Sequence, residues 1–184
     1  MARVDNYEQR FGGIGRLYTL EGLARLRQAH VCVIGIGGVG SWVVEALARS
    51  GVGQITMIDM DDICVTNINR QLPALSGNIG KLKTEVMAER VKLINPECVV
   101  NIIDDFISPD NQAKYLNRGY DYVIDAIDNV KTKAAMIAYC KRNKIKIITI
   151  GGAGGQTDPS KIQIADLSKT IQDPLLAKVR SVLR

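Results

Sequence analysis

The sequence predicts an α/β fold, with a doubly wound and mainly parallel sheet between layers of helices. Short apolar segments alternate along the chain with helix-like segments, which is the pattern of repeated strand–helix–strand units. A glycine-rich turn joins the first apolar segment to the following helix, as in nucleotide-binding sheets of this class. Right-handed crossovers then bring the carboxyl ends of the strands to one edge of the sheet, where ligands bind.

The hydrophobic pattern places the elements of this alternation. Strands are expected over residues 31–34, 55–58, 98–103, 122–126 and 145–150. Helices are expected over residues 38–50, 81–94 and 130–143, with another that begins at Ser108 as cap and Pro109 as first residue. The predicted buried face of helix 38–50 consists of Val39, Trp42, Val43, Ala46 and Leu47. Gly51 is its predicted stop, because glycine accepts the left-handed backbone that ends many helices.

The two ends of the chain carry weaker signals. Thr19 is a plausible cap for a short amphipathic helix that contains Leu20, Leu23, Ala24 and Leu26. Beyond the fifth strand, residues 151–155 form a flexible glycine run, and residues 161–165 alternate like a strand with one solvated face. A final helix is expected from Asp173–Pro174 to the last residue, and the chain looks truncated there.

Composition is that of an ordinary globular protein: 184 residues fit one domain, with 46% apolar and 23% charged residues. No apolar run is long enough to span a bilayer, and residues 1–5 lack the apolar core of a secretory signal, so the cytoplasm is the expected location. The four cysteines lie too far apart in sequence for paired zinc ligands. Three of them, Cys32, Cys98 and Cys140, are expected to be buried free thiols.

Part of the net charge of +5 is local. The residues concerned are Lys131, Lys133, Lys141, Arg142, Lys144 and Lys146. A solvated helix end accounts for such a cluster, because cations suit a helix carboxyl terminus. A nucleic-acid contact is the alternative.

The turn that opens helix 38–50 carries the motif G-x-G-x-x-G, formed by Gly35, Gly37 and Gly40. The amides of such a turn and the amino end of the helix favour an anion. Gly38 removes one more side chain from the position beside the phosphates. The motif by itself predicts a nucleotide and leaves its identity open.

Two acids follow the second strand. Asp59 stands 24 positions after Gly35, where dinucleotide enzymes place an acid on the ribose hydroxyls, so an NAD-dependent oxidoreductase is one interpretation. Asp61 lies two positions further on an extended segment and points the same way, which suits a ribose together with a nearby cation. A polar turn is the alternative role of Asp61 and Asp62.

Arg70 and Lys83 favour a triphosphate. Arginine offers a bidentate fork and lysine a mobile point charge, and a triphosphate carries more charge than a helix terminus can offset. Asn67 and Gln71 can hold ribose or phosphate without adding charge. Lys83 stands at the start of a helix, where the dipole disfavours a cation, which indicates a bound anion; a surface lysine is the alternative.

Asp128 follows the fourth strand at the ligand-binding edge of the sheet. A carboxylate there can hold Mg²⁺ against the phosphates of a nucleotide. Asn129 is assigned to the same nucleotide site. The alternative for Asp128 and for Asn129 is to cap the helix that begins at residue 130.

These residues together resemble the superfamily of ubiquitin-activating enzymes and their bacterial relatives ThiF and MoeB. The matching segments are residues 35–41, 51–53, 59–61, 67–71, 80–83, 95–96 and 128–129. The resemblance implies that superfamily's Rossmann-like ATP-binding fold, MgATP as cofactor and adenylation of a carboxylate. It implies contacts of Arg70 and Lys83 with phosphate, of Asp59 with ribose and of Asp128 with the metal.

In that superfamily an arginine near the N-terminus often reaches the ATP of the partner subunit. Arg16 is the first candidate for this role and Arg10 the second.

Finer features are similar to the TcdA family, also called CsdL, the tRNA threonylcarbamoyladenosine dehydratases. They lie at residues 10–13, 59–62, 104–106, 138–140, 151–156 and 170–174. The resemblance implies ATP-dependent activation of the threonyl carboxylate of this modified adenosine beside the anticodon, then ring closure with release of AMP and pyrophosphate. It also implies a tRNA substrate, a homodimer and a link to the CsdA/CsdE cysteine desulfurase system.

Members of that family continue beyond the point where this chain ends. Residues 1–184 are therefore expected to be one ATP-binding adenylation domain without the family's C-terminal segment, which carries the family's candidate catalytic cysteine.

Other functions stay open at this stage. Adenylation of the C-terminal glycine of a small sulfur-carrier protein uses the same site. An NAD-dependent oxidoreductase explains the glycines and Asp59 but gives Arg70, Lys83 and Asp128 no role. A non-catalytic scaffold that dimerises and recruits partners is a further alternative.

Overall fold

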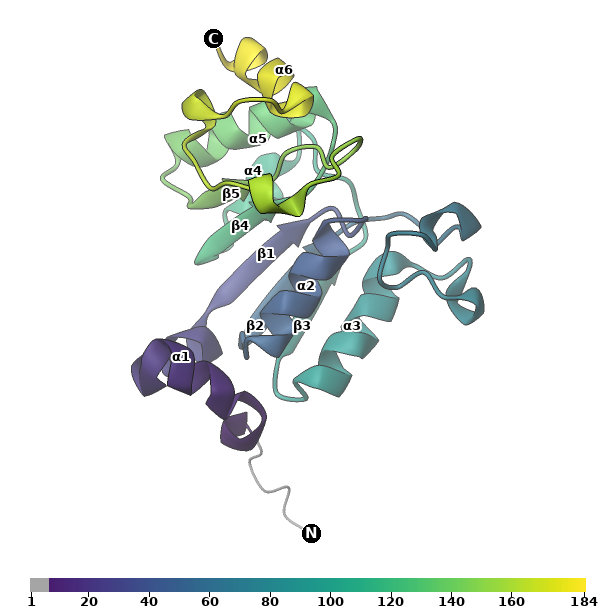
Figure 1. Ribbon diagram of the computed structural model, residues 1–184, viewed down its shortest axis with the longest axis vertical. Helices are drawn as coiled ribbons and strands as arrows, with labels where there is room; N and C mark the ends of the chain where they lie inside the picture. The colour runs from purple at the N-terminus through teal and green to yellow at the C-terminus, as the bar shows by residue number, and fades with distance from the viewer. Residues whose placement is uncertain (1–6) are drawn as a thin grey trace.

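The computed structural model describes residues 7–184, so the expectation about a signal sequence at residues 1–5 lies outside the described part. Five parallel strands form one sheet in the order β3-β2-β1-β4-β5, with helices on both faces (Figure 1). The strands are β1 (His30–Ile34), β2 (Gln54–Ile58), β3 (Val99–Ile103), β4 (Tyr122–Asp125) and β5 (Ile147–Thr149). This arrangement confirms the predicted doubly wound α/β fold.

Six α-helices accompany the sheet in the described residues. They are α1 (Tyr7–Gln28), α2 (Gly40–Arg49), α3 (Lys83–Ile94), α4 (Gln112–Leu116), α5 (Val130–Arg142) and α6 (Pro174–Leu183). Across residues 7–184, no helix combines the length and the hydropathy needed to cross a membrane. Gly51, with φ +78°, follows α2 as its predicted stop, and Asp173 caps α6 by accepting the amide of Leu176.

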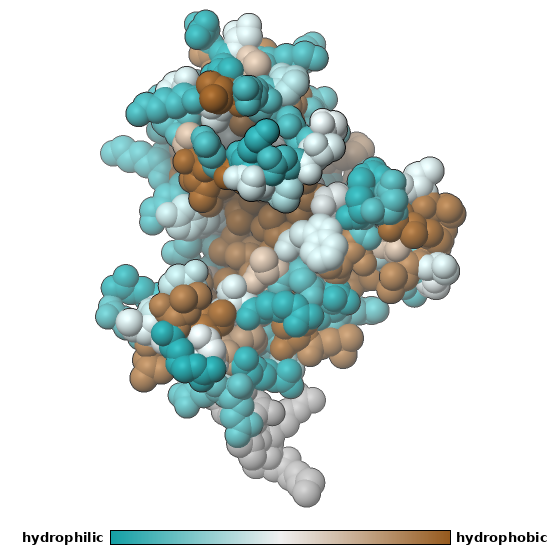
Figure 2. Space-filling view, in the orientation of Figure 1, coloured by the Kyte–Doolittle hydropathy of each residue, from teal (hydrophilic) through white to brown (hydrophobic). Residues whose placement is uncertain are grey.

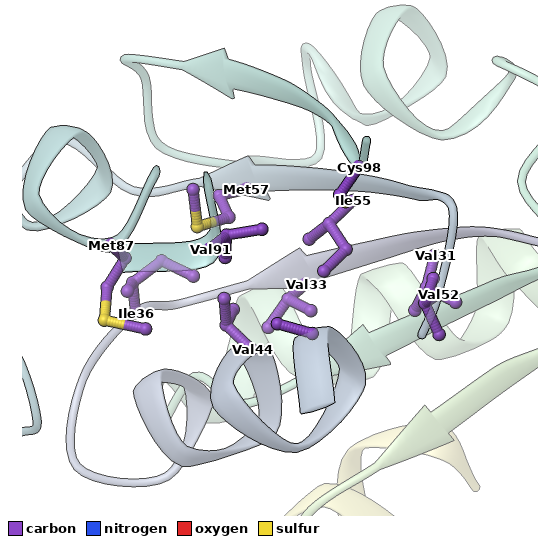
Figure 3. Packing of buried hydrophobic residues seen from close by; sticks show 11 residues of the cluster. Val31, Val33, Ile36, Val44, Val52, Ile55, Met57, Met87, Val91 and Cys98 are labelled. Atoms are coloured by element: carbon purple, nitrogen blue, oxygen red, sulfur yellow. The ribbon is translucent and has the colours of Figure 1, made fainter. Parts of the chain in front are cut away.

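Successive residues of β1 serve opposite faces of the sheet. Val31 and Val33 belong to a buried cluster that joins the sheet to α2 and α3 (Figure 3). Cys32 and Ile34 belong to a second cluster, with side chains of α4 and α5 on the other face. Because both faces are covered, β1 reads as a continuous apolar run, which is why it was visible in the sequence.

The N-terminal helix is longer than predicted. α1 contains a break at Thr19, whose φ of 69° and ψ of 164° are not helical. The Thr19 hydroxyl accepts the amide of Gly22 at 3.3 Å and caps the second half, as expected from the sequence. α1 packs at the amino ends of the strands, where the Tyr7 hydroxyl donates to the carbonyl of Gly51 and the amide of Gly53 donates to Leu26.

The predicted face of α2 was only partly right, since Val43 and Leu47 pack partly buried against the core but Trp42 and Ala46 do not. Its buried residues are Gly40, Ser41, Val44, Glu45 and Ala48, whereas Trp42 is exposed. Glu45 can lie on the buried face because two arginines pair with it: Arg90 of α3 donates to it at 2.6 and 2.9 Å, and Arg49 at 2.7 Å. A buried carboxylate that is paired in this way is not visible as part of an apolar stripe.

Ser108 and Pro109 do not begin a helix, so that prediction was also wrong. The Asn111 side chain accepts the amide of Ser108 and donates to the carbonyl of Phe106, both at 2.7 Å. These bonds close a loop, and α4 starts only at Gln112.

Residues 161–165 form no strand, which corrects a third prediction. Ile162 and Ile164 are almost fully exposed, and no strand of the described residues pairs with this segment. Asp158 and Asp166 turn the chain at either end by accepting the amides of Ser160 and Ser168. These local bonds, typical of aspartate, compete with an extended conformation.

The cysteines behave as predicted. Cys32, Cys98 and Cys140 are buried free thiols. Burial raises the pKa of Cys32 to about 12 and those of Cys98 and Cys140 to about 11. All three therefore stay protonated and unreactive near neutral pH.

Candidate nucleotide site

The glycine turn lies between β1 and α2 at the carboxyl edge of the sheet. Gly35 has a φ of +85°, which favours glycine, and a side chain at Gly40 would come within 1.7 Å of the Gly35 carbonyl oxygen. The residue before α2, Val39, gives the helix no side-chain cap. The first amides of α2 thus lack a side-chain acceptor and suit a phosphate.

Asp59, at the end of β2, braces this turn. One carboxylate oxygen accepts the amide of Ile36 at 2.6 Å, and the other accepts the amide of Asp61 at 2.8 Å. The ribose contact predicted for Asp59 remains a prediction. The structure adds a role that the sequence did not reveal, because the same carboxylate fixes the glycine loop against the next strand.

Arg70 and Gln71 meet the glycine turn from a separate segment of the chain. A side chain at Gly38 would lie 3.2 Å from Cγ of Arg70, and one at Gly37 would lie 3.8 Å from Nε2 of Gln71. The Arg70 guanidinium is exposed and donates to the carbonyl of Thr66 and to Asn69. The structure therefore brings together residues that the sequence analysis assigned to one site.

Gln71 and Asn67 are both buried but differ in their partners. The side-chain oxygen of Asn67 accepts the amide of Cys64 at 3.0 Å and so holds the loop. The side-chain oxygen of Gln71 has no hydrogen-bond partner, although the residue is only 7% exposed. Because a buried polar atom without a partner is costly, this group fits a ligand that supplies a donor, such as a nucleotide hydroxyl.

Lys83 and Asp61 form an ion pair of 2.7 Å between Nζ and Oδ2. The lysine side chain is 7% exposed and that of the aspartate is 60% exposed. Lys83 is thus not the surface lysine of the alternative interpretation. Asp61 supplies an anion that stabilises a cation at the start of α3, so the position of Lys83 alone does not require a bound phosphate.

Asp128 and Asn129 lie in the turn between β4 and α5. A side chain at Gly35 would contact Ile127 at 2.9 Å and the backbone of Ala126 at 3.2 Å, so this turn packs directly on the glycine turn. Asp128 is exposed. Asn129 caps α5 by accepting the amide of Thr132 at 3.0 Å, the structural role that the sequence left open for it.

A metal at this site has few protein ligands available. Across residues 7–184, no three side chains of His, Cys, Asp or Glu are grouped as a metal site. Asp128 fits Mg²⁺ as a single carboxylate ligand, since Mg²⁺ in nucleotide sites takes most of its ligands from phosphates and water.

Sequence analysis missed the network beneath this turn. Lys133, assigned to a solvated basic cluster, has a fully buried side chain, which corrects that assignment. Its Nζ donates to Oδ2 of Asp125 at 2.8 Å, to the hydroxyl of Thr149 at 3.1 Å and to the carbonyl of Ile150 at 3.0 Å. The other oxygen of Asp125 accepts the amide of Ile127 at 3.2 Å.

This network joins the carboxyl ends of β4 and β5 to the first turns of α5. Burial lowers the pKa of Lys133, and the Asp125 carboxylate opposes that shift. The one sequence signal was the position of Lys133, three residues after Val130 on a helix that covers the sheet.

Arg16 is not part of this constellation. It lies exposed on α1, which packs at the amino ends of the strands, whereas the glycine turn lies at their carboxyl ends (Figure 1). Arg10, the second candidate, donates to the carbonyl of Ile94 at 3.2 Å, at the end of α3. Neither arginine meets the site within one chain.

Residues 13–179 match the ThiF family over most of the chain. The chain belongs to the ThiF family. It is 88% identical over 184 residues to the tRNA threonylcarbamoyladenosine dehydratase of Haemophilus influenzae, covering all of this chain and 70% of that protein. It is 63% identical over 180 residues to the Escherichia coli protein of the same name, covering 98% of this chain and 67% of that one.

A solved structure agrees with this membership of the ThiF family. The crystal structure of the E. coli dehydratase TcdA in complex with ATP has a TM-score of 0.96 and 62% identity to this chain. The match covers 100% of this chain and 75% of that chain. The resemblance identified from the sequence is therefore confirmed.

Replacing Gly40 by alanine is expected to abolish ATP binding, because the new methyl group collides with the Gly35 carbonyl and opens the turn. Isothermal titration with ATP measures the loss. Gly77→Ala is the matched control, since nothing lies within 4 Å of its added methyl group. Equal ATP affinity in both variants would contradict the role given to the turn.

Replacing Lys133 by methionine is expected to lower the free energy of unfolding by about 3–5 kcal/mol, because it leaves the Asp125 carboxylate buried without its cation. Urea unfolding measures the change. Lys141→Met on the exposed side of α5 is the control and should stay within about 0.5 kcal/mol. A loss below about 1 kcal/mol for Lys133→Met would refute the importance of the pair.

Proposed function

We propose that this protein uses ATP to activate the threonyl carboxylate of threonylcarbamoyladenosine in tRNA, beside the anticodon, and that ring closure then releases AMP. The observation that carries the proposal is 88% identity, over the whole chain, to a tRNA threonylcarbamoyladenosine dehydratase. The convergence of glycine turn, Arg70, Lys83 and Asp128 at one sheet edge supports it.

Adenylation of a carboxylate by ATP requires cations that offset negative charge, and it requires no general base. A threonyl carboxylate is already ionised at neutral pH, so no side chain has to remove a proton before attack. One carboxylate oxygen attacks the α-phosphorus, and the bond from phosphorus to pyrophosphate breaks. A neighbouring nitrogen of the modified nucleoside then attacks the activated carbonyl carbon and loses its proton to water, and the carboxylate oxygen bonded to phosphorus leaves with AMP.

Two cations of this chain oppose the repulsion between carboxylate and triphosphate. Arg70 lies beside the glycine turn with an exposed guanidinium that can form paired hydrogen bonds with phosphate. Lys83 can turn from Asp61 to the phosphates, because the aspartate is mostly exposed and can be solvated. The charge that moves to pyrophosphate is thus met by Arg70 beside the glycine turn and by Lys83 once it has turned from Asp61.

Magnesium and the nucleotide contacts complete the proposal. Asp128 would hold Mg²⁺, which when bound neutralises phosphate charge and orients the leaving group. Asp59 would bind the ribose, with Asp61, Asn67, Gln71 and Asn129 around the nucleotide.

The protein is proposed to act as a homodimer in the cytoplasm, with Arg16 of one subunit at the ATP of the other. Arg16 lies on α1, which packs at the opposite end of the strands from the glycine turn, so the proposal places its action between subunits. A link to the CsdA/CsdE cysteine desulfurase system follows from the family resemblance and stays a prediction.

Adenylation of a sulfur-carrier protein is the second candidate. It uses the same ATP site but activates a protein carboxylate. It therefore predicts ATP–pyrophosphate exchange that depends on the carrier protein and not on tRNA. The dinucleotide interpretation has less support, because it gives no role to Arg70 beside the glycine turn.

AMP is expected to form from MgATP only when tRNA carrying threonylcarbamoyladenosine is added. Asp128→Asn should slow this reaction by at least about a hundredfold, because an essential charge is lost. Asp110→Asn, an exposed carboxylate elsewhere, is the control. Equal AMP formation with unmodified tRNA would contradict the proposed substrate. An unchanged rate in Asp128→Asn would contradict the role of Asp128.

Mixing two inactive variants tests the dimer. Arg16→Ala and Asp128→Asn subunits are expected to recover about a quarter of wild-type activity, because half of randomly mixed dimers contain one complete site out of two. AMP formation and analytical ultracentrifugation measure the outcome. No recovery from mixed dimers would show that Arg16 does not act between subunits.

A further inference from the structure

Trp42 is a large aromatic side chain placed in solvent beside the nucleotide site. It is the sole tryptophan of the chain and 56% of it is exposed. It is the third residue of α2, so it lies about 3 Å along the helix from the amino end that is proposed to face the phosphates. Tryptophan side chains are highly buried on average, so the exposure of this one beside the nucleotide site indicates a role in binding.

The orientation of the indole is fixed. Its Nε1 donates to the carbonyl of Arg70 at 3.1 Å, which ties the edge of the ring to the segment carrying the predicted phosphate ligand. The bond satisfies the only polar atom of the ring. What remains is an exposed apolar surface whose position is set by two parts of the site, α2 and the Arg70 segment.

We propose that Trp42 is a stacking platform for a base of the RNA substrate that lies next to the reacting nucleoside. The inference rests on the proposed function and adds to it a contact that selects nucleic acid. It makes Trp42 a residue that positions the substrate, with no part in the bond-making steps.

The chemistry around Trp42 suits RNA. Single-stranded loops are recognised by stacking unstacked bases on aromatic side chains, and any base has a face to offer. The indole is held on the segment that carries Arg70, beside the place where the proposed function puts the triphosphate. The reacting nucleoside must approach the glycine turn, so its neighbours in the loop come to the same part of the surface.

The surrounding surface also contains exposed apolar side chains. Val65, Ile68, Leu75 and Ile79 are exposed on the segment between β2 and α3. This segment projects from the side of the sheet (Figure 1), and apolar side chains are visible on it in Figure 2. Such residues also suit a protein contact, so an interface with a second copy of the chain is the outcome that competes with RNA. The hydrogen bond that holds the indole beside the nucleotide site favours RNA over a second copy of the chain.

The fluorescence of the sole tryptophan reports on this contact directly. An anticodon stem-loop carrying threonylcarbamoyladenosine is titrated into the protein, and quenching of Trp42 is expected in parallel with binding. Stem-loops with an abasic site at each neighbour of the modified nucleoside are titrated next. The base that stacks on Trp42 is the one whose removal abolishes the quenching.

Kinetics of AMP formation separate stacking from a merely structural role. Trp42→Leu is expected to raise the KM for the stem-loop between about fivefold and a hundredfold, the range for loss of one base–aromatic stack, with kcat and the KM for ATP unchanged. Trp42→Phe should stay within about threefold of the wild type, because the aromatic face remains. Tyr122→Leu, a half-exposed aromatic at the other end of the strands, is the control.

Three results would overturn the inference. They are an unchanged KM for the stem-loop in Trp42→Leu, the absence of any fluorescence change on RNA binding, and dissociation of a dimer by Trp42→Leu in ultracentrifugation. If the wild type forms no AMP with the modified RNA, the proposed function fails, and the fluorescence titration still decides whether Trp42 contacts RNA. Normal AMP formation without any effect at Trp42 overturns the stacking contact alone.

Discussion

The buried ion pair between Asp125 and Lys133 is the constraint on which the carboxyl edge of the sheet depends. Both side chains are removed from water, a state that costs several kcal/mol per ion unless each charge is paired and hydrogen-bonded. The pair meets that demand by joining β4, β5 and α5 through Thr149 and the Ile150 carbonyl. The turn with Asp128 therefore connects β4 to α5, and these two elements cannot separate without exposing the ion pair to water or leaving one of its charges buried and unpaired.

The glycine turn is held by a second carboxylate, which lies at the end of β2. Asp59 accepts two backbone amides and so links the end of β2 to the segment that follows β1. Gly35 leaves room for the turn after β4, and Gly38 leaves room for Arg70. The carboxylates hold the loops through hydrogen bonds, and the glycines, which have no side chain, allow the loops to approach one another. At this rim a phosphate can meet backbone amides and the Arg70 guanidinium, and Lys83 reaches it by turning from Asp61.

The exposed surface around this rim separates two tasks. The charged groups beside the glycine turn suit the triphosphate, whereas Trp42 presents an apolar face tied to the same segment as Arg70. A family of adenylating proteins can share the first set and differ in the second, since fold and nucleotide site do not choose the carboxylate to be activated. We infer that substrate choice in this protein lies in such surface positions.

The sequence by itself determined the alternation of strands and helices along the chain and the place of the glycine turn between β1 and α2. Buried parallel strands are continuous apolar runs, and the glycine motif has a fixed relation to strand and helix, so both are local signals. The tertiary structure alone decided which charges are buried. Lys133 and Glu45 resemble surface residues in the sequence, and only the approach of Asp125 from β4 and of Arg90 from α3 makes their burial possible. For the same reason the face of α2 could not be fully predicted, since it depends on which partner the fold brings to it, whereas the missing strand at residues 161–165 reflects local bonds of Asp158 and Asp166.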